Sequence, residues 1–217
     1  MEKNAVMSID KRETARTQAR YQRIAPFYDA MELFAERRYA DWRPRLWSLV
    51  QGPRVLEVGV GTGKNIPYYP DGAQMTAIDL TPGMLELAKV RATELNAAVA
   101  LQLGDVQALD FPDETFDDVV ATFVFCSVPD PVLGFDEIAR VLKPNGRLHL
   151  LEHMRSPNPV LGTLMDLLDP VTVRLMGPHI NRRTVQNVQQ SRLHLERVED
   201  VGAGGIFKLI LAQRRRR

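Results

Sequence analysis

Strand and helix patterns alternate through the middle of the chain, and this alternation restricts the possible folds more than any other feature of the sequence. Helix patterns follow Thr81-Pro82 and cover 135–142. Strands that are apolar on both faces and joined by helices form parallel sheets covered on both sides, so we expect an α/β fold. The expected strands are 54–58, 74–78, 99–103, 116–125 and 147–151.

The N-terminal part of the chain predicts two helical regions in front of this sheet. A helix is expected over 10–24, where Asp10 and Glu13 have the spacing of a capping box. Apolar residues at helical spacing predict a second region over 31–50, packed on a core and bent at Pro44.

The C-terminal part predicts the completion of the sheet. Beyond an apolar stretch at 157–176, two closing strands are expected at 195–198 and 206–212. We interpret the chain as effectively one domain. Its expected parts are a helical cap (1–50), a main domain (51–213) with an insertion at 155–185, and a basic tail (214–217).

Composition excludes several other kinds of protein. The chain has 217 residues, 45% of them hydrophobic, and its single cysteine, Cys126, allows no internal disulfide. One cysteine and four scattered histidines cannot form a structural zinc cage, so no metal is expected. No stretch of about 18 apolar residues and no signal peptide pattern occur, which predicts a cytoplasmic protein.

Charge is distributed unevenly along the chain. Residues 1–47 carry a net charge of +3, residues 48–150 carry −7, and residues 151–217 carry +5. Basic flanks favour an anionic surface as a partner, either a membrane or a nucleic acid, although chance variation explains the asymmetry equally well.

A glycine-rich turn follows the first expected strand, in the segment Glu57-Val-Gly59-Val-Gly61-Thr-Gly63. Glycines at such a turn let the backbone approach a ligand closely. The dinucleotide-binding fingerprint requires a further glycine where this chain has Lys64, and the spacing of a phosphate-binding loop is also absent. The turn therefore predicts a ligand site without identifying the ligand.

Two aspartates follow the next strands at the same sheet edge. Asp79 ends the second expected strand, 20 residues after Gly59, where a carboxylate can accept hydrogen bonds from ribose hydroxyls. Asp105 follows the third strand. Each could simply end a strand, but together with the glycine turn they predict one binding site.

The motifs VLEVGVGTG (55–63), AIDLTPGML (77–85), GDVQALDFPDETFDDVV (104–120) and IARVLKPNGRL (138–148) resemble those of the class I S-adenosylmethionine-dependent methyltransferases. The resemblance covers about residues 20–155 and implies a Rossmann-like, seven-stranded, mostly parallel sheet with helices on both faces and an antiparallel last strand. It implies S-adenosyl-L-methionine as cofactor. The implied cofactor-binding residues are Glu57, Gly59, Gly61 and Gly63 at the methionine end, Asp79 at the ribose, Asp105 and Val106 at the adenine, and Tyr28, Leu80, Met84 and Phe123 nearby.

Softer similarities concern the methyl acceptor. Segments including 21–29, 123–131 and 205–210 look like those of bacterial phosphatidylethanolamine N-methyltransferases, and they are also similar to membrane-associated thiol methyltransferases and quinone C-methyltransferases. The resemblance implies a hydrophobic or lipid acceptor. A nucleic acid is not expected, because the centre is acidic and no Asn/Asp-Pro-Pro-Tyr/Phe motif occurs.

Five residues are candidates for the acceptor site. Glu152 and His153 follow the fifth strand at the ligand-binding edge and could accept a proton from an amine, or they could pair structurally with Arg155. Tyr21 and Tyr28 belong to the segment that folds over the cofactor in such enzymes. The fifth candidate is His179, in the turn after the apolar stretch.

Two segments could contact a membrane from the cytoplasmic side. The arginine stripe of Arg12, Arg16, Arg20 and Arg23 could meet anionic headgroups or be a solvated helix face. The apolar stretch at 157–176 could form a lid or acyl-chain groove, or it could pack onto the sheet. A binding module without turnover is the alternative outside the enzymes, and the intact glycines and aspartates argue against it.

Overall fold

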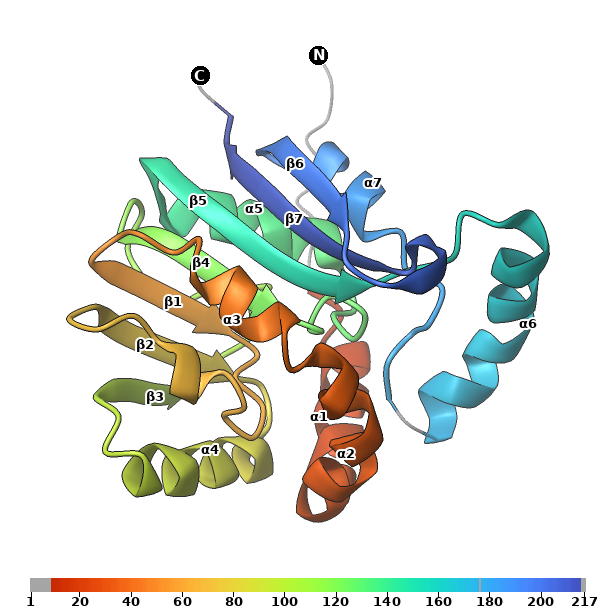
Figure 1. Cartoon of the computed structure of the whole chain (residues 1–217), viewed down its shortest axis with the longest axis horizontal. Helices are drawn as coiled ribbons and strands as arrows, with labels where there is room; N and C mark the ends of the chain where they lie inside the picture. The colour runs from red at the N-terminus through yellow and green to blue at the C-terminus, as the bar shows by residue number, and fades with distance from the viewer. Residues whose placement is uncertain (1–8, 176, 216–217) are drawn as a thin grey trace.

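The expected sheet is present in the structure, a computed structural model that describes residues 9–175 and 177–215. Its strands lie in the order β3-β2-β1-β4-β5-β7-β6 (Figure 1). β7 pairs antiparallel with both neighbours, and the remaining pairs are parallel, as the resemblance implied. The strands are β1 (Arg54–Val58), β2 (Gln74–Asp79), β3 (Val99–Leu103), β4 (Phe116–Thr122), β5 (Leu142–His153), β6 (Leu193–Asp200) and β7 (Phe207–Arg214).

Helices cover both faces of this sheet because successive strand residues point to opposite sides. α3 (Trp42–Trp47) buries Leu46 against Val55 on one face, where α4 (Pro82–Glu94) also packs. α5 (Pro131–Val141) and α7 (Thr184–Gln190) cover the other face, with Phe135 and Val188 in one cluster with Leu56. The Rossmann-like expectation is therefore confirmed.

The N-terminal helices differ from the expectation in where they break. α1 (Lys11–Ile24) begins after Asp10, as predicted, and a short 3-10 turn links it to α2 (Tyr28–Tyr39). The bend expected at Pro44 lies at residues 40–41 instead, because proline is tolerated in the first turn of α3. Met31 is exposed, so the predicted apolar face is not continuous with the core.

The strand limits that differ most from the prediction are the end of β4 and the start of β5, whereas other limits, such as both limits of β6, differ by one or two residues. β4 ends at Thr122 rather than at residue 125, since Phe123 adopts a positive φ of 57°. β5 begins at Leu142 rather than at residue 147. There the chain pairs Leu142 with Phe116 and then bulges before the regular pairing resumes, and the proline and glycine of this bulge resemble a turn in the sequence.

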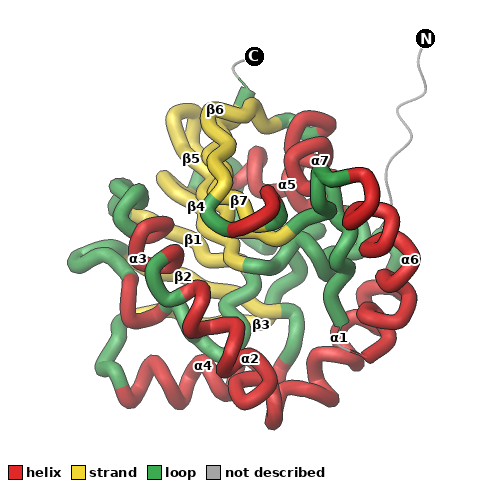
Figure 2. The backbone as a smooth tube through the Cα atoms, turned by 45° about the vertical axis from the view of Figure 1, so that its right-hand side comes forward, coloured by secondary structure: helices red, strands yellow, loops and turns green. Residues whose placement is uncertain are grey.

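The apolar stretch forms a helix that stands beside the sheet rather than on it. α6 (Pro159–Leu175) lies beyond the ends of the strands, next to the segment that leads to α7 (Figures 1 and 2). One of the two predictions for the apolar stretch, that it packs onto the sheet, is therefore wrong for the exposed residues of α6. Those are Val160, Leu161, Leu164, Leu167, Leu168, Val171 and Leu175, whereas Met176 lies outside the described residues.

The polar side of α6 faces the rest of the chain. Arg155 donates to both carboxylate oxygens of Asp166, at 3.0 Å from Nε, and Asp169 Oδ2 lies 2.7 Å from His179 Nδ1. A surface helix normally buries its apolar side, so α6 has the opposite arrangement. Within the described ranges, no helix is long and apolar enough to cross a membrane.

Candidate functional site

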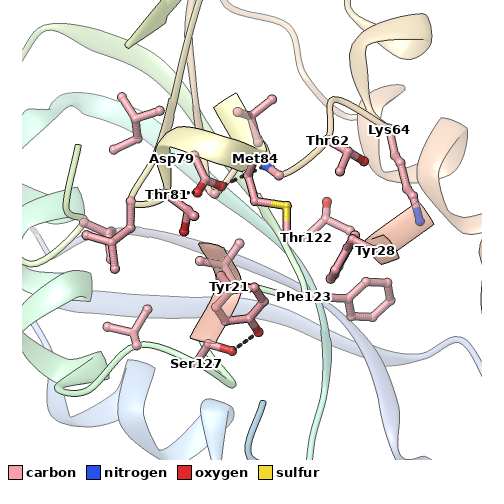
Figure 3. A pocket seen from close by; sticks show the side chains of 18 of the residues that line it. Tyr21, Tyr28, Thr62, Lys64, Asp79, Thr81, Met84, Thr122, Phe123 and Ser127 are labelled. Carbon is pink, nitrogen blue, oxygen red and sulfur yellow. Dashed lines mark hydrogen bonds between the residues drawn. The ribbon is translucent and has the colours of Figure 1, made fainter. Parts of the chain in front are cut away.

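A cavity of about 1000 Å³, partly open to solvent, lies where the parallel strands end. Ligands bind at this edge in open α/β sheets. Nine of the expected cofactor residues line it, together with Tyr21, and Figure 3 shows several of them. The nine are Tyr28, Gly59, Gly61, Asp79, Leu80, Met84, Asp105, Val106 and Phe123.

The three glycines of the turn have different roles. All have positive φ, of 69°, 57° and 83° at Gly59, Gly61 and Gly63. A Cβ on Gly59 would lie 2.5 Å from Val124, whereas a Cβ on Gly61, which lines the cavity, would meet nothing within 4 Å. Gly63 is not on the cavity wall; it allows close packing, since a Cβ there would lie 3.2 Å from the backbone of Ala88. Gly61 therefore leaves open the space that a ligand can use.

Asp79 ties this turn to the start of α4. Its Oδ2 accepts the Gly61 N–H at 2.9 Å, and its Oδ1 accepts the Thr81 N–H at 2.8 Å. Burial raises the pKa of the carboxyl, and these two hydrogen bonds oppose the shift. The carboxylate is thus fixed on the cavity wall with lone pairs left for ribose hydroxyls (Figure 3).

The part of the wall near Leu80 and Asp105 is joined to α1 by side-chain hydrogen bonds. Asp105 Oδ1 accepts the Gln107 N–H at 2.9 Å, and Gln107 Nε2 donates to Thr14 Oγ1 at 3.2 Å. Gln18 Nε2 donates to the Leu80 carbonyl at 2.8 Å. The helix α1 therefore closes one side of the cavity over the two expected adenine residues.

Glu57 lies behind the cavity rather than on its wall. Its carboxylate accepts hydrogen bonds from Asn65 Nδ2 at 2.6 Å and from the Tyr69 hydroxyl. Burial raises the pKa of Glu57 to about 7, although both hydrogen bonds oppose this. Asn65 itself lines the cavity. Glu57 thus positions Asn65. The resemblance implied that Glu57 faces the methionine end of the cofactor, but Glu57 does not line the cavity.

Charged residues that the sequence interpretation missed line the cavity near Asn65. Lys64 Nζ lies 3.4 Å from Glu36 and 3.6 Å from Asp29 but makes no hydrogen bond within the described residues. Arg43 Nη1 donates to Asn65 at 2.7 Å, and its Nη2 lies 2.6 Å from Glu36. Lys64 stands where the dinucleotide-binding fingerprint has its last glycine. This departure from the fingerprint is the sequence signal that could have indicated Lys64 as a site residue.

Tyr21 and Tyr28 both lie on the cavity wall, as the resemblance implied for the segment that folds over it. Their rings are 6.4 Å apart, and the Tyr21 hydroxyl is hydrogen-bonded to Ser127 Oγ at 2.5 Å (Figure 3). Burial raises the pKa of each phenol well above its ordinary value, so both hydroxyls stay protonated at neutral pH.

Glu32 is, like Glu36, a carboxylate of the cavity wall that the sequence interpretation did not find. It lines the cavity and makes no hydrogen bond or ion pair within the described residues. Burial raises the pKa of its carboxyl. Glu32 follows Tyr28 by four residues, so one face of α2 presents both, and this spacing could have indicated it.

Glu152 and His153 are not on the cavity wall, which corrects their expected place. Glu152 Oε1 accepts the N–H groups of Val124 and Phe125 at 2.8 and 2.9 Å, and burial raises the pKa of its carboxyl to about 8. His153 stacks on Phe123 with ring centres 6.2 Å apart, and burial lowers its pKa to about 4. Both residues support the backbone that forms the wall, because β5 is central and this strand end is covered by the 123–125 turn.

His179 lies in a second cavity of about 470 Å³ next to the first. The two cavities share part of their walls. The shared residues are Thr17, Ser127 and Pro129; the second cavity is further lined by Glu13, Arg20, Gly177, His179 and Arg182.

Comparisons with known proteins agree with this geometry. A family model described as a methyltransferase domain matches residues 56–150. A phosphatidylethanolamine N-methyltransferase of Cereibacter sphaeroides is 34% identical over 76% of this chain and 82% of its own length. A demethylmenaquinone methyltransferase of Renibacterium salmoninarum is 31% identical, over 81% of this chain and 73% of its own. The structure of an S-adenosylmethionine-dependent methyltransferase of Thermotoga maritima is 19% identical, with a TM-score of 0.69 over 92% of this chain and 100% of that chain.

Proposed function

This chain belongs to the class I S-adenosylmethionine-dependent methyltransferases, and we propose that its methyl acceptor is the amine of a phospholipid headgroup at a membrane surface. It is an enzyme, and S-adenosyl-L-methionine is its cofactor. A relative that is 34% identical to this chain is a phosphatidylethanolamine N-methyltransferase. The exposed apolar side of α6 is the single structural observation that carries the lipid acceptor.

The residues of the first cavity fit the cofactor. Bound S-adenosylmethionine supplies an electrophilic methyl group on a sulfonium. Asp79 can accept hydrogen bonds from the ribose hydroxyls, and the space in front of Gly61 admits the ligand close to the backbone. Lys64, whose Nζ makes no hydrogen bond within the described chain, can donate to a carboxylate.

An amine acceptor must lose a proton before it attacks, and Glu32 is positioned to take part. An ammonium group can rest against the ring of Tyr21 while the nearby carboxylate attracts it, whereas Lys64 Nζ already lies 5.3 Å from the centre of the Tyr28 ring. The same carboxylate can then accept the proton. Because Glu32 has no hydrogen-bond partner in the described part of the chain, no existing bond must break for this role.

The α6 helix supports a lipid as the source of this amine. Leu164 and Leu167 are 48% and 74% exposed, on the side of the helix that faces away from Asp166 and Asp169. A contiguous exposed apolar surface marks an interaction site. We place this side of α6 in the interfacial region of a membrane, with the basic residues of α1 attracted to anionic headgroups.

Methyl transfer to vesicles tests this function. Phosphatidylethanolamine in anionic vesicles should be methylated at least tenfold faster than a hydrophobic thiol or a demethylated quinone in the same vesicles. The double variant Leu164→Ser/Leu167→Ser should reduce both vesicle sedimentation and lipid methylation, whereas Thr163→Ser on the same helix should not. Transfer to the thiol or the quinone with none to the lipid amine would overturn the proposal.

A further inference from the structure

The second cavity contains two arginine side chains without carboxylate partners. Neither Arg20 nor Arg182 forms an ion pair within the described residues, although both are half-buried. Arg182 donates to the carbonyls of Cys126 at 3.3 Å and Val128 at 2.8 Å, which fixes its guanidinium at the wall. A half-buried cation held only by neutral carbonyls has charge left to bind an anion.

The carboxylates near this cavity are engaged elsewhere. Glu13 lines the cavity but pairs with Arg16 on its own helix. Asp169 lies 2.7 Å from His179 Nδ1 and accepts the N–H of Ile180 at 2.9 Å. Burial lowers the pKa of Arg182, and the nearby acidic groups, Cys126 first and then Asp169, oppose this shift. The cavity is therefore a place of excess positive charge.

Tyr21 separates this cavity from the cofactor cavity. Its hydroxyl is hydrogen-bonded to Ser127, which lines both cavities. A Cβ on Gly177, which lines the second cavity, would lie 3.3 Å from the Tyr21 ring. A group bound beside Arg20 and Arg182 thus lies next to the wall that Tyr21 and Ser127 form on the side of the first cavity.

We propose that the second cavity binds the phosphate group of the methyl acceptor through Arg20 and Arg182, which rests on the proposed function. Phosphate oxygens match the guanidinium donors, and the Thr17 and Ser127 hydroxyls are on the shared wall. In an ethanolamine phosphodiester, two carbons and an ester oxygen separate the phosphorus from the nitrogen. This short link carries the amine past Tyr21 toward Glu32 while the phosphate stays between the arginines.

Binding to the protein loaded with S-adenosylhomocysteine tests the subsite directly. Inorganic phosphate and glycerophosphoethanolamine are titrated by calorimetry into the parent, Arg20→Gln, Arg182→Lys and the control Lys11→Gln, which removes an exposed charge from the same helix. Each cavity variant should weaken both ligands about tenfold, the usual effect of losing a charge-assisted hydrogen bond or its bidentate geometry. Lys11→Gln should stay within twofold of the parent. Equal affinities in all four proteins would overturn the subsite.

Kinetics separates this inference from the proposed function. With glycerophosphoethanolamine, Arg20→Gln should raise KM about tenfold and leave kcat within about twofold, because the phosphate is held equally in ground and transition states. Ethanolamine, which lacks the phosphate, should show no difference among the variants. If lipid amines are methylated with an unchanged KM in Arg20→Gln, the subsite is wrong and the function stands. If phosphate binding depends on both arginines but only thiols or quinones are methylated, the proposed function is wrong, and the cavity binds an anion that is not part of the methyl acceptor.

Discussion

At the scale of single residues, the site depends on a glycine whose missing side chain leaves space for a ligand, as well as on side chains that make contacts. Gly61 faces open space on the cavity wall, and Asp79 fixes its N–H. Gly59, two residues earlier, is confined by Val124. The same substitution at the two positions therefore has different consequences for stability and for cofactor binding.

Gly61→Ala should weaken S-adenosylmethionine binding at least tenfold while lowering stability only by the strain of a left-handed alanine, about 1–2 kcal/mol. Gly59→Ala should lower stability further, because its Cβ would lie 2.5 Å from Val124. Calorimetry gives the affinities and urea unfolding gives the free energies. Unchanged cofactor affinity in Gly61→Ala would contradict the position of the ligand.

Glu32→Gln should lower turnover about 10²-fold, the usual contribution of a positioned proton acceptor, and leave cofactor affinity nearly unchanged. The parent rate should also rise with pH as Glu32 loses its proton, at a pH above that of an ordinary glutamate, since burial raises this pKa. Steady-state kinetics over pH measures both effects, and Glu94→Gln, at an exposed position at the end of α4, is the control. Turnover within threefold of the parent would exclude Glu32 as the acceptor of the proton.

Glu152→Gln should change the pH dependence of stability. The pKa of Glu152 is raised by burial from 4.5 to about 8, so between these values the folded protein binds more protons than the unfolded chain. The free energy of unfolding of the parent should therefore fall as pH rises through this window, by up to about 1.4 kcal/mol per unit from this group. The glutamine can still accept the Val124 and Phe125 N–H groups, so urea unfolding of the variant should give a shallower slope. Identical slopes would contradict the assignment of Glu152 as a buried, protonated support.

At the scale of elements, α1 is held over the cavity by polar contacts rather than by a buried apolar side. Thr17 is its single buried residue among those described. Gln18 donates to the Leu80 carbonyl, and Gln22 Oε1 accepts the Gly83 N–H at 2.8 Å. Asp10 caps the helix by accepting two N–H groups of its first turn. An element with few buried contacts opens more easily than the core.

S-adenosylhomocysteine should slow amide hydrogen exchange in α1 more than in α6, because α1 lines the cofactor cavity and α6 does not. Asp10→Ala should speed exchange in α1 of the free protein, since an N-cap is worth about 1 kcal/mol. Mass spectrometry of exchanged peptides covering 11–24 and 159–175 measures both. Equal protection of the two helices by the ligand would contradict the place of α1.

Local sequence patterns predicted the central strands and helices. They failed where contacts between distant segments determine the end of a strand or the direction of a side chain. The β1 turn and Asp79 were found because glycines and strand-end carboxylates are visible in the sequence. The end of β4 was missed because Phe123 takes a positive φ that nothing in its residue type signals. Glu152 was placed in the site from its strand end, but its carboxylate turns to the backbone of the neighbouring segment. Such choices depend on packing that a single sequence does not display.

At the scale of the whole molecule, the sheet brings the cofactor cavity, the second cavity and α6 to one end. The parallel strands direct their carboxyl ends toward α1, α2 and α6 (Figures 1 and 2). A lipid whose acyl chains lie along α6 could present its phosphate to Arg20 and Arg182 and its amine to Glu32. The proposed acceptor thus uses three separate features of the same end of the fold.

Competition between acceptors in a single vesicle preparation tests whether the phospholipid amine receives the methyl group. Vesicles that contain equal amounts of phosphatidylethanolamine, a demethylated quinone and a hydrophobic thiol are incubated with the protein and S-adenosylmethionine carrying a ¹³C-labelled methyl group. Tandem mass spectrometry then locates the label. We expect the label on the nitrogen of the phospholipid headgroup. Label on the quinone ring carbon or on the thiol sulfur, with none on the headgroup nitrogen, would exclude the phospholipid amine as the acceptor.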